Sequence, residues 1–252
     1  MLYIGIDLSA RRGFDVAMLD DERRVVEIWR AATLDLLGER LASYTEDFVA
    51  AVDAPQQPSD FPMRRPEVRA LLPVPPPDGR FTRYRVCDYE LARRNIGLYL
   101  LPEPGQEAPD WMVLGFETFV RLRERHRLRL PADAGDHRAT LLEIYPYGGF
   151  VTLLGGRPPR KTTPAGAAAW RQALLQAGLQ GVPADPLTHD AVAALCAAYT
   201  GWAWRHGAGS ALGLPNEGFI VLPVPESALR DRYRALPEAR GGRRAARRTR
   251  VT

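Results

Sequence analysis

The first eight residues, MLYIGIDL, constrain the fold of this chain more than any other stretch. Residues 2–6 are apolar or small, and they run directly into the carboxylate of Asp7. A near-continuous apolar run predicts a central strand that is buried on both faces. A carboxylate at the end of such a strand is costly unless a cation, a metal or a hydrogen-bond network pairs with it. We therefore expect the fold to bring partners to Asp7.

The segment after this strand predicts an antiparallel meander. Strands are indicated over residues 2–8, 14–19 and 24–29, with only short turns between them. Strands joined by such short connections must run antiparallel to their neighbours.

The next two elements predict a second carboxylate beside the first. Residues 34–45 have the apolar spacing of a helix, and residues 48–52 form another short apolar run that ends in Asp53. A strand that follows a helical crossover returns parallel to the strand it left. If the two strands are neighbours, Asp7 and Asp53 lie side by side at their carboxyl ends, where open α/β sheets bind ligands.

The rest of the chain predicts an α/β domain over residues 1–237 with a long insertion. Proline recurs throughout residues 54–110, which is too long for a plain loop in a compact domain. Beyond the first four strands, two further strands are indicated over residues 140–145 and 218–222, and helices over residues 88–95, 111–127, 164–177 and 188–204.

Charge and composition narrow the class of protein. The formal net charge is +4, but residues 238–252 hold six arginines against Glu238, a balance of 6 − 1 = +5. The remaining body is therefore 4 − 5 = −1, which argues against a basic nucleic-acid-binding module. We expect the Arg-rich tail to be disordered, with a phosphate-binding arm as the alternative.

Cysteine usage and hydropathy predict a cytoplasmic protein. Cys87 and Cys196 do not make a disulfide framework, and neither has a zinc-site spacing. No apolar run reaches the ~18–20 residues of a membrane span, and the start of the chain lacks the pattern of a signal peptide. We expect no membrane partner.

Three more positions are candidates for a site with Asp7 and Asp53. Glu143 lies within a predicted strand, Asp190 lies in the first turn of a predicted buried helix, and Lys161 is the only lysine of the chain. Lysine at this position could orient water or bind phosphate, or could simply be a surface residue.

Each acidic candidate also has a structural alternative. Asp53 could form a turn with the backbone, and Asp190 is favourable at a helix N-terminus on dipole grounds alone. Glu143 could pair with an arginine such as Arg85. His189 could shuttle a proton, although a histidine at a helix start is more often ordinary.

One further segment has a structural alternative of its own. Arg85, Asp88 and Arg93 could form an ion-pair network that holds the insertion down.

Seven motifs, in matching order from Tyr3 to Pro223, resemble one known family. They are GIDLS, AVDAP, RVCDYELARRNIG, LEIYP, PRKTTPAG, THDAVAAL and NEGFIVLP. The set is similar to the family called domain of unknown function 429, which is predicted to consist of ribonuclease H-like nucleases. The resemblance implies a ribonuclease H-like fold with a five-stranded mixed sheet flanked by helices. It also implies catalytic carboxylates on strand one, strand four and a late helix, here Asp7, Asp53 and Asp190, with Glu143 as a fourth.

These residues predict a metal-dependent nuclease or phosphodiesterase. Phosphodiester hydrolysis needs an activated water and relief of charge on the leaving oxygen, and two Mg²⁺ or Mn²⁺ ions held by carboxylates supply both. DNA or RNA is then the expected partner.

Two other functions stay open. One is a non-catalytic scaffold of the same fold that binds nucleic acid or a protein. The other is an actin-like small-molecule kinase, which would need a second Asp-Gly-Gly phosphate loop. The segment from Tyr147 to Gly149 lacks the acidic residue of that loop.

Overall fold

The meander and the parallel return predicted from the sequence form one half of a seven-stranded sheet. The computed structural model describes residues 1–126 and 140–236. Its sheet has the order β3-β2-β1-β4-β5-β7-β6, in which β1, β4, β5 and β7 run parallel and the other pairs antiparallel. The strands are β1 (Leu2–Ser9), β2 (Gly13–Leu19), β3 (Val25–Ala31), β4 (Phe48–Asp53), β5 (Thr140–Ile144), β6 (Ser210–Leu214) and β7 (Gly218–Leu222).

The described residues therefore carry seven strands rather than the five that the resemblance implied. The additional strands are β7, which the sequence indicated, and β6, which it did not. β6 has the sequence SALGL, and Gly213 within it adopts a φ of +123°. A strand with so little apolar alternation gives almost no periodic signal, and its pairing with β7 holds it in place.

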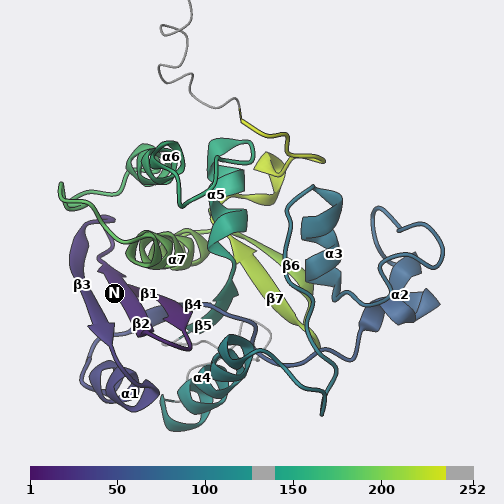
Figure 1. Cartoon of the computed structure of the whole chain (residues 1–252), viewed down its shortest axis with the longest axis horizontal. Coiled ribbons are helices and arrows are strands. Elements are labelled where there is room, and N and C mark those ends of the chain that lie inside the picture. Colours follow the sequence, from purple (N-terminus) through teal and green to yellow (C-terminus); the bar gives the residue numbers. More distant parts are fainter. Residues whose placement is uncertain (127–139, 237–252) are drawn as a thin grey trace, which may run out of the picture.

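Helices cover both faces of the sheet (Figure 1). α5, α6 and α7 lie on one face, and α1 and α4 lie on the other. Successive residues of β1 alternate between the two cores, with Tyr3 packed in the core beneath α7 and Ile4 in the core beneath α1 and α4. The helices are α1 (Leu34–Ala42), α2 (Pro66–Ala70), α3 (Val86–Arg93), α4 (Asp110–His126), α5 (Pro146–Leu154), α6 (Pro164–Gln176) and α7 (His189–Arg205).

The predicted helices are all present, with shifted ends, and two further helices were missed. The short helix of the insertion spans α3 rather than residues 88–95, and α2 gave no recognisable pattern. α5 was missed because Pro146 follows a strand and looks like a stop signal. In the structure Pro146 occupies the first turn of α5, where a missing N–H costs nothing.

The insertion forms the side of the molecule that carries α2 and α3, next to β6 (Figure 1). No helix among residues 1–126 and 140–236 is both long and apolar enough to cross a membrane. The prediction for the tail, residues 238–252, lies outside the described residues.

Gly5 of β1 allows α7 to approach the sheet closely. A Cβ atom built at Gly5 would lie 1.9 Å from the backbone oxygen of Ala194 and 2.3 Å from the backbone nitrogen of Ala198. Helix rise is about 1.5 Å per residue and strand rise about 3.3 Å, so four residues of α7 match two residues of β1. One turn before Ala194 is Asp190, and two residues after Gly5 is Asp7. This contact therefore sets the first turn of α7 beside the end of β1.

Candidate functional site

Asp7 and Asp53 are direct neighbours at the carboxyl ends of two parallel strands. β1 and β4 pair in a register that places Asp7 opposite Asp53, and the Cα atoms of such neighbours are about 5 Å apart. Asp7 is 7% exposed, and Asp53 is partly exposed. The sequence-based prediction that these two residues lie side by side is confirmed.

The electrostatics of this pair oppose ionisation. Burial raises the pKa of Asp7 well above its usual range, and the charges of Asp53 and Asp190 raise it further. Burial also raises the pKa of Asp53, while the Lys161 ammonium lowers it. Two neighbouring carboxyl groups do not both ionise easily, so a cation beside them would favour their charged forms.

Asp190 is the third carboxylate of the cluster. It lies in the first turn of α7, where the Thr188 side chain caps the helix by accepting from the Ala191 amide at 3.1 Å. Asp190 is 4% exposed, and its charge acts on both Asp7 and Asp53. The Arg12 guanidinium contacts one of its oxygens, and His189 Nε2 lies 2.9 Å from the other.

Glu143 takes part in a buried ion-pair network. Its Oε1 and Oε2 accept from Arg85 Nη2 at 2.8 Å and Nη1 at 3.0 Å. Arg85 also donates to Asp88, and Gln56 donates to Glu143 through its backbone and its side chain. The alternative pairing with Arg85 is thus confirmed, and it fastens the insertion to β5.

The predicted network is only partly the one that forms. Arg93 does not join Arg85 and Asp88 but pairs with Glu90, with an Nη2–Oε2 distance of 2.7 Å. Both oxygens of Glu143 are engaged, so ligation of a metal by Glu143 stays a prediction.

Lys161 lies in the loop before α6, and its charge acts on the aspartates of the cluster. Its side chain is exposed, and its charge lowers the pKa of both Asp7 and Asp53. It therefore lies close enough to the two aspartates to stabilise their charged forms, and it lines the same cavity.

A cavity of about 670 Å³ opens over these residues. Its volume lies within the range of about 300–1,000 Å³ that small-ligand sites occupy. Its charged lining comprises Asp7, Asp53, Asp88, Glu143, Asp190, Arg12, Arg85, Arg160, Lys161 and His189.

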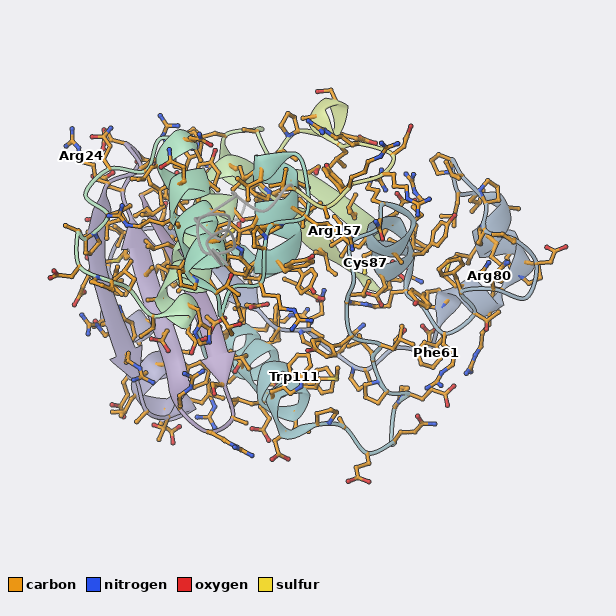
Figure 2. All side chains as sticks on the ribbon, turned by 45° about the horizontal axis from the view of Figure 1, so that its top comes forward. Arg24, Phe61, Arg80, Cys87, Trp111 and Arg157 are labelled. Carbon is orange, nitrogen blue, oxygen red and sulfur yellow. The ribbon has the colours of Figure 1, made fainter. Side chains whose placement is uncertain are left out.

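Sequence reasoning missed the aromatic part of this cavity. Tyr99, Trp111, Tyr145 and Tyr147 all line it. Trp111 lies at the beginning of α4, between the sheet on one side and the part of the insertion with Phe61 and Arg80 on the other (Figure 2). The signal that could have found these residues is the position of Tyr145 and Tyr147 directly after β5, at the sheet edge where the carboxylates lie.

The carboxylate oxygens of the site could in part serve as ligands of a divalent metal ion. Carboxylate oxygens are the ligands that Mg²⁺ and Mn²⁺ prefer. Among the residues that the structure describes, no group of three or more acidic, histidine or cysteine side chains is already arranged to hold a metal. Asp7 and Asp53 fit as a pair, and Asp190, whose oxygens contact Arg12 and His189, is the third carboxylate that could join them.

The fold and the site together define a mixed α/β protein with two neighbouring aspartates, one of them buried, at the ends of two parallel strands. The chain belongs to the family described as "Protein of unknown function (DUF429)", whose model matches residues 5–217. This match confirms the resemblance seen in the sequence motifs. No curated protein and no solved structure matches the chain.

Proposed function

We propose that this protein is a metal-dependent nuclease or phosphodiesterase that hydrolyses phosphodiester bonds of nucleic acid. The observation that carries the proposal is the neighbouring pair Asp7–Asp53, with Asp7 buried and Asp190 close enough to raise the pKa of both. Neighbouring carboxylates repel each other, and a divalent cation between them would relieve that repulsion.

The arrangement of strands supports a ribonuclease H-like assignment. The sequence predicts a three-stranded meander and a parallel fourth strand, and the resemblance implies carboxylates on strand one, strand four and a late helix. The order of β1 to β4 agrees with that description, and so do the positions of Asp7, Asp53 and Asp190. On this assignment β6 and β7 extend the sheet beyond β5.

The side chains then have distinct roles in hydrolysis. A bound Mg²⁺ or Mn²⁺ supplies Lewis acidity and a water of lowered pKa. Asp7 and Asp53 hold the ion, and Asp190 completes its ligand set. Lys161 and Arg160 face the same cavity and bind the substrate phosphate. His189, in contact with Asp190, is placed to hold or pass a proton.

Cleavage assays with a matched pair of variants test this function. Purified protein is incubated in Mn²⁺ with single-stranded, double-stranded and branched DNA and RNA. We expect the wild type to cleave at least one of these, Asp7→Asn to lose roughly 10³-fold or more in rate, and Asp78→Asn, an exposed carboxylate in the insertion, to keep full activity. Cleavage of none of these substrates, or full activity of Asp7→Asn, would overturn the proposal.

A second candidate function is a scaffold of the same fold without catalysis. It is favoured by the engagement of Glu143 with Arg85 and by the lack of a ready three-ligand group among the described residues. Calorimetry separates the two: a scaffold binds nucleic acid but takes up no Mn²⁺, and Asp7→Asn leaves its binding unchanged.

The kinase alternative gains no support from the segment Tyr147 to Gly149, which lacks the acidic residue of the required loop. Gly148 and Gly149 lie in the first turn of α5 and are buried. A Cβ at Gly149 would lie 2.9 Å from Cys196 Sγ, so this glycine serves close packing.

A further inference from the structure

We propose that the cavity binds a nucleotide whose base is unpaired and unstacked, with the base against the aromatic side chains of the cavity. This inference rests on the proposed function, since it places the phosphate of that nucleotide at Asp7 and Asp53. It names the substrate class: single strands, frayed ends or free nucleotides rather than an intact duplex.

The first observation is that four of the aromatic rings that line the cavity form two pairs from different segments. Tyr99 and Trp111 bracket the end of the insertion and meet edge to face, with ring centroids 5.5 Å apart. Tyr145 and Tyr147 follow β5 and meet in the same way at 6.0 Å. All four rings line the cavity that also holds the aspartate pair. Aromatic faces of this kind stack nucleobases without regard to sequence.

The second observation ties these rings to the carboxylates. Tyr145 directly follows β5, and the register of β4 and β5 places Glu143 opposite Val52, the residue before Asp53. The rings and the two aspartates line one cavity. A base stacked on these rings would therefore be near the aspartates, as a phosphate attached to the same nucleotide requires.

The third observation is that the exposed ring is held in position. Tyr99 is 70% exposed, so its ring is free to accept a ligand. The segment that carries it is fixed because the Tyr145 hydroxyl donates to the Gly97 carbonyl at 2.6 Å. A fixed, exposed ring loses little conformational entropy when a base stacks on it.

Charge and volume agree with this class of ligand. Arg12, Arg160 and Lys161 line the same cavity and can meet the phosphates on either side of a bound base. A duplex keeps its bases stacked inside and offers no free base plane to Tyr99. A volume of about 670 Å³ suits one or two nucleotides.

The test measures binding by the full-length chain in the presence of a chelator, so that metal-dependent cleavage cannot interfere. The probes are a fluorescent single-stranded oligonucleotide, the matching duplex, an abasic oligonucleotide with the same phosphates, and a mononucleotide. We expect the single strand to bind at least tenfold more tightly than the duplex and the abasic strand. If the mononucleotide competes fully, the ligand is a free nucleotide; if it does not, the ligand is a strand.

Three variants assign the effect to the aromatic side chains. Tyr99→Ala should weaken single-strand binding roughly tenfold, the loss expected for one stacked base, whereas Tyr99→Phe should retain it. Leu71→Ala, an exposed apolar residue of the insertion outside the cavity lining, is the control. Equal binding of the abasic strand, or an unchanged affinity in Tyr99→Ala, would overturn the inference.

The result of this binding test can be distinguished from the result of the cleavage test for the proposed function. Base-dependent binding without cleavage by the wild type in Mn²⁺ would refute hydrolysis and leave this inference standing. Cleavage lost in Asp7→Asn, together with no preference for exposed bases, would refute this inference alone.

Discussion

At the scale of single residues, the energetics of the site centre on the ionisation of two neighbouring aspartates. Asp7 is buried next to Asp53, and both pKa values are raised by that burial. A carboxyl group whose pKa is higher in the folded than in the unfolded chain binds its proton more tightly when folded. The folded, metal-free protein is therefore least stable at a pH high enough to ionise this carboxyl group. Residues placed at such a cost to stability are typical of functional sites.

The sign of the pH dependence gives a first prediction. Below about pH 4 both the folded and the unfolded chain are protonated at Asp7, and the penalty vanishes. As the pH rises above this value, the free energy of unfolding should fall. Asp7→Asn should remove much of this slope and should be more stable than the wild type at pH 8 by about 1–3 kcal/mol, or several degrees in Tm.

Chemical denaturation of the wild type and of Asp7→Asn between pH 4 and pH 9, in the presence of a chelator, measures both free energies of unfolding and checks this prediction. Some slope should persist in the variant, because burial also raises the pKa of Glu217 to about 7. Equal slopes, with Asp7→Asn the less stable protein at pH 8, would show that Asp7 is an ordinary stabilising carboxylate.

At the scale of elements, the contact between β1 and α7 aligns the site. The small residues of α7 let its backbone approach Gly5 closely enough to leave no space for a side chain. This contact sets Asp190 beside Asp7, so packing and site geometry depend on the same glycine.

Gly5→Ala should therefore cost more than about 3 kcal/mol of stability, because the new methyl group meets backbone rather than a flexible side chain. Variants that still fold should also bind Mn²⁺ more weakly, since α7 must shift away from β1. The control is Gly97→Ala, where a Cβ meets nothing within 4 Å. Urea unfolding compares them, and a loss in Gly5→Ala no larger than in Gly97→Ala would contradict this account of the contact.

The ion-pair network between the insertion and β5 gives a third prediction. Arg85→Met removes the cation and leaves Asp88 and Glu143 buried without their partner. The expected cost is about 3–5 kcal/mol. Arg65→Met, which breaks an exposed pair with Asp60, should cost about 0–1 kcal/mol. Denaturant titration of both variants measures the difference, and similar costs would mean that the buried network does not hold the insertion.

At the scale of the whole molecule, charge is divided between the body and the Arg-rich tail. The six arginines of residues 238–252 outweigh the single Glu238, while the rest of the chain sums to −1. Non-specific attraction to nucleic acid should therefore depend on the tail. Metal binding and catalysis should depend on the rest of the chain.

Replacing the six tail arginines with glutamine should weaken nucleic-acid binding and flatten its dependence on salt. For a single strand, the slope of log K against log salt should fall by about 0.7 for each phosphate that the tail no longer neutralises. Metal binding should not change. An unaltered salt slope would mean that cations of the body supply the attraction.

The sequence predicted the parts of the fold that depend on local pattern. The buried strand ending at Asp7, the meander, and the parallel return to Asp53 follow from apolar runs and turn lengths, and the structure has all three. The pairing of Asp7 with Asp53 then follows from strand direction once the two strands are neighbours, as they are in the structure. Thr188 was likewise predictable as the residue before α7.

The remaining features depend on contacts between distant segments. β6 is held by pairing with β7, and Pro146 begins a helix although it follows a strand. The contact of Arg12 with Asp190 joins a turn near the start of the chain to a helix near its end. Such pairings leave no periodic trace in a single sequence, so only the structure reveals them.

The most direct measurement of the central claim is the location of a metal ion. A crystal of the wild type soaked in Mn²⁺ is measured for anomalous scattering, with an Asp7→Asn crystal treated in the same way. We predict anomalous density bounded by the carboxylates of Asp7, Asp53 and Asp190 in the wild type, and none there in the variant. Density absent from this site in the wild type, or equally present in Asp7→Asn, would contradict the assignment of these aspartates as a metal centre.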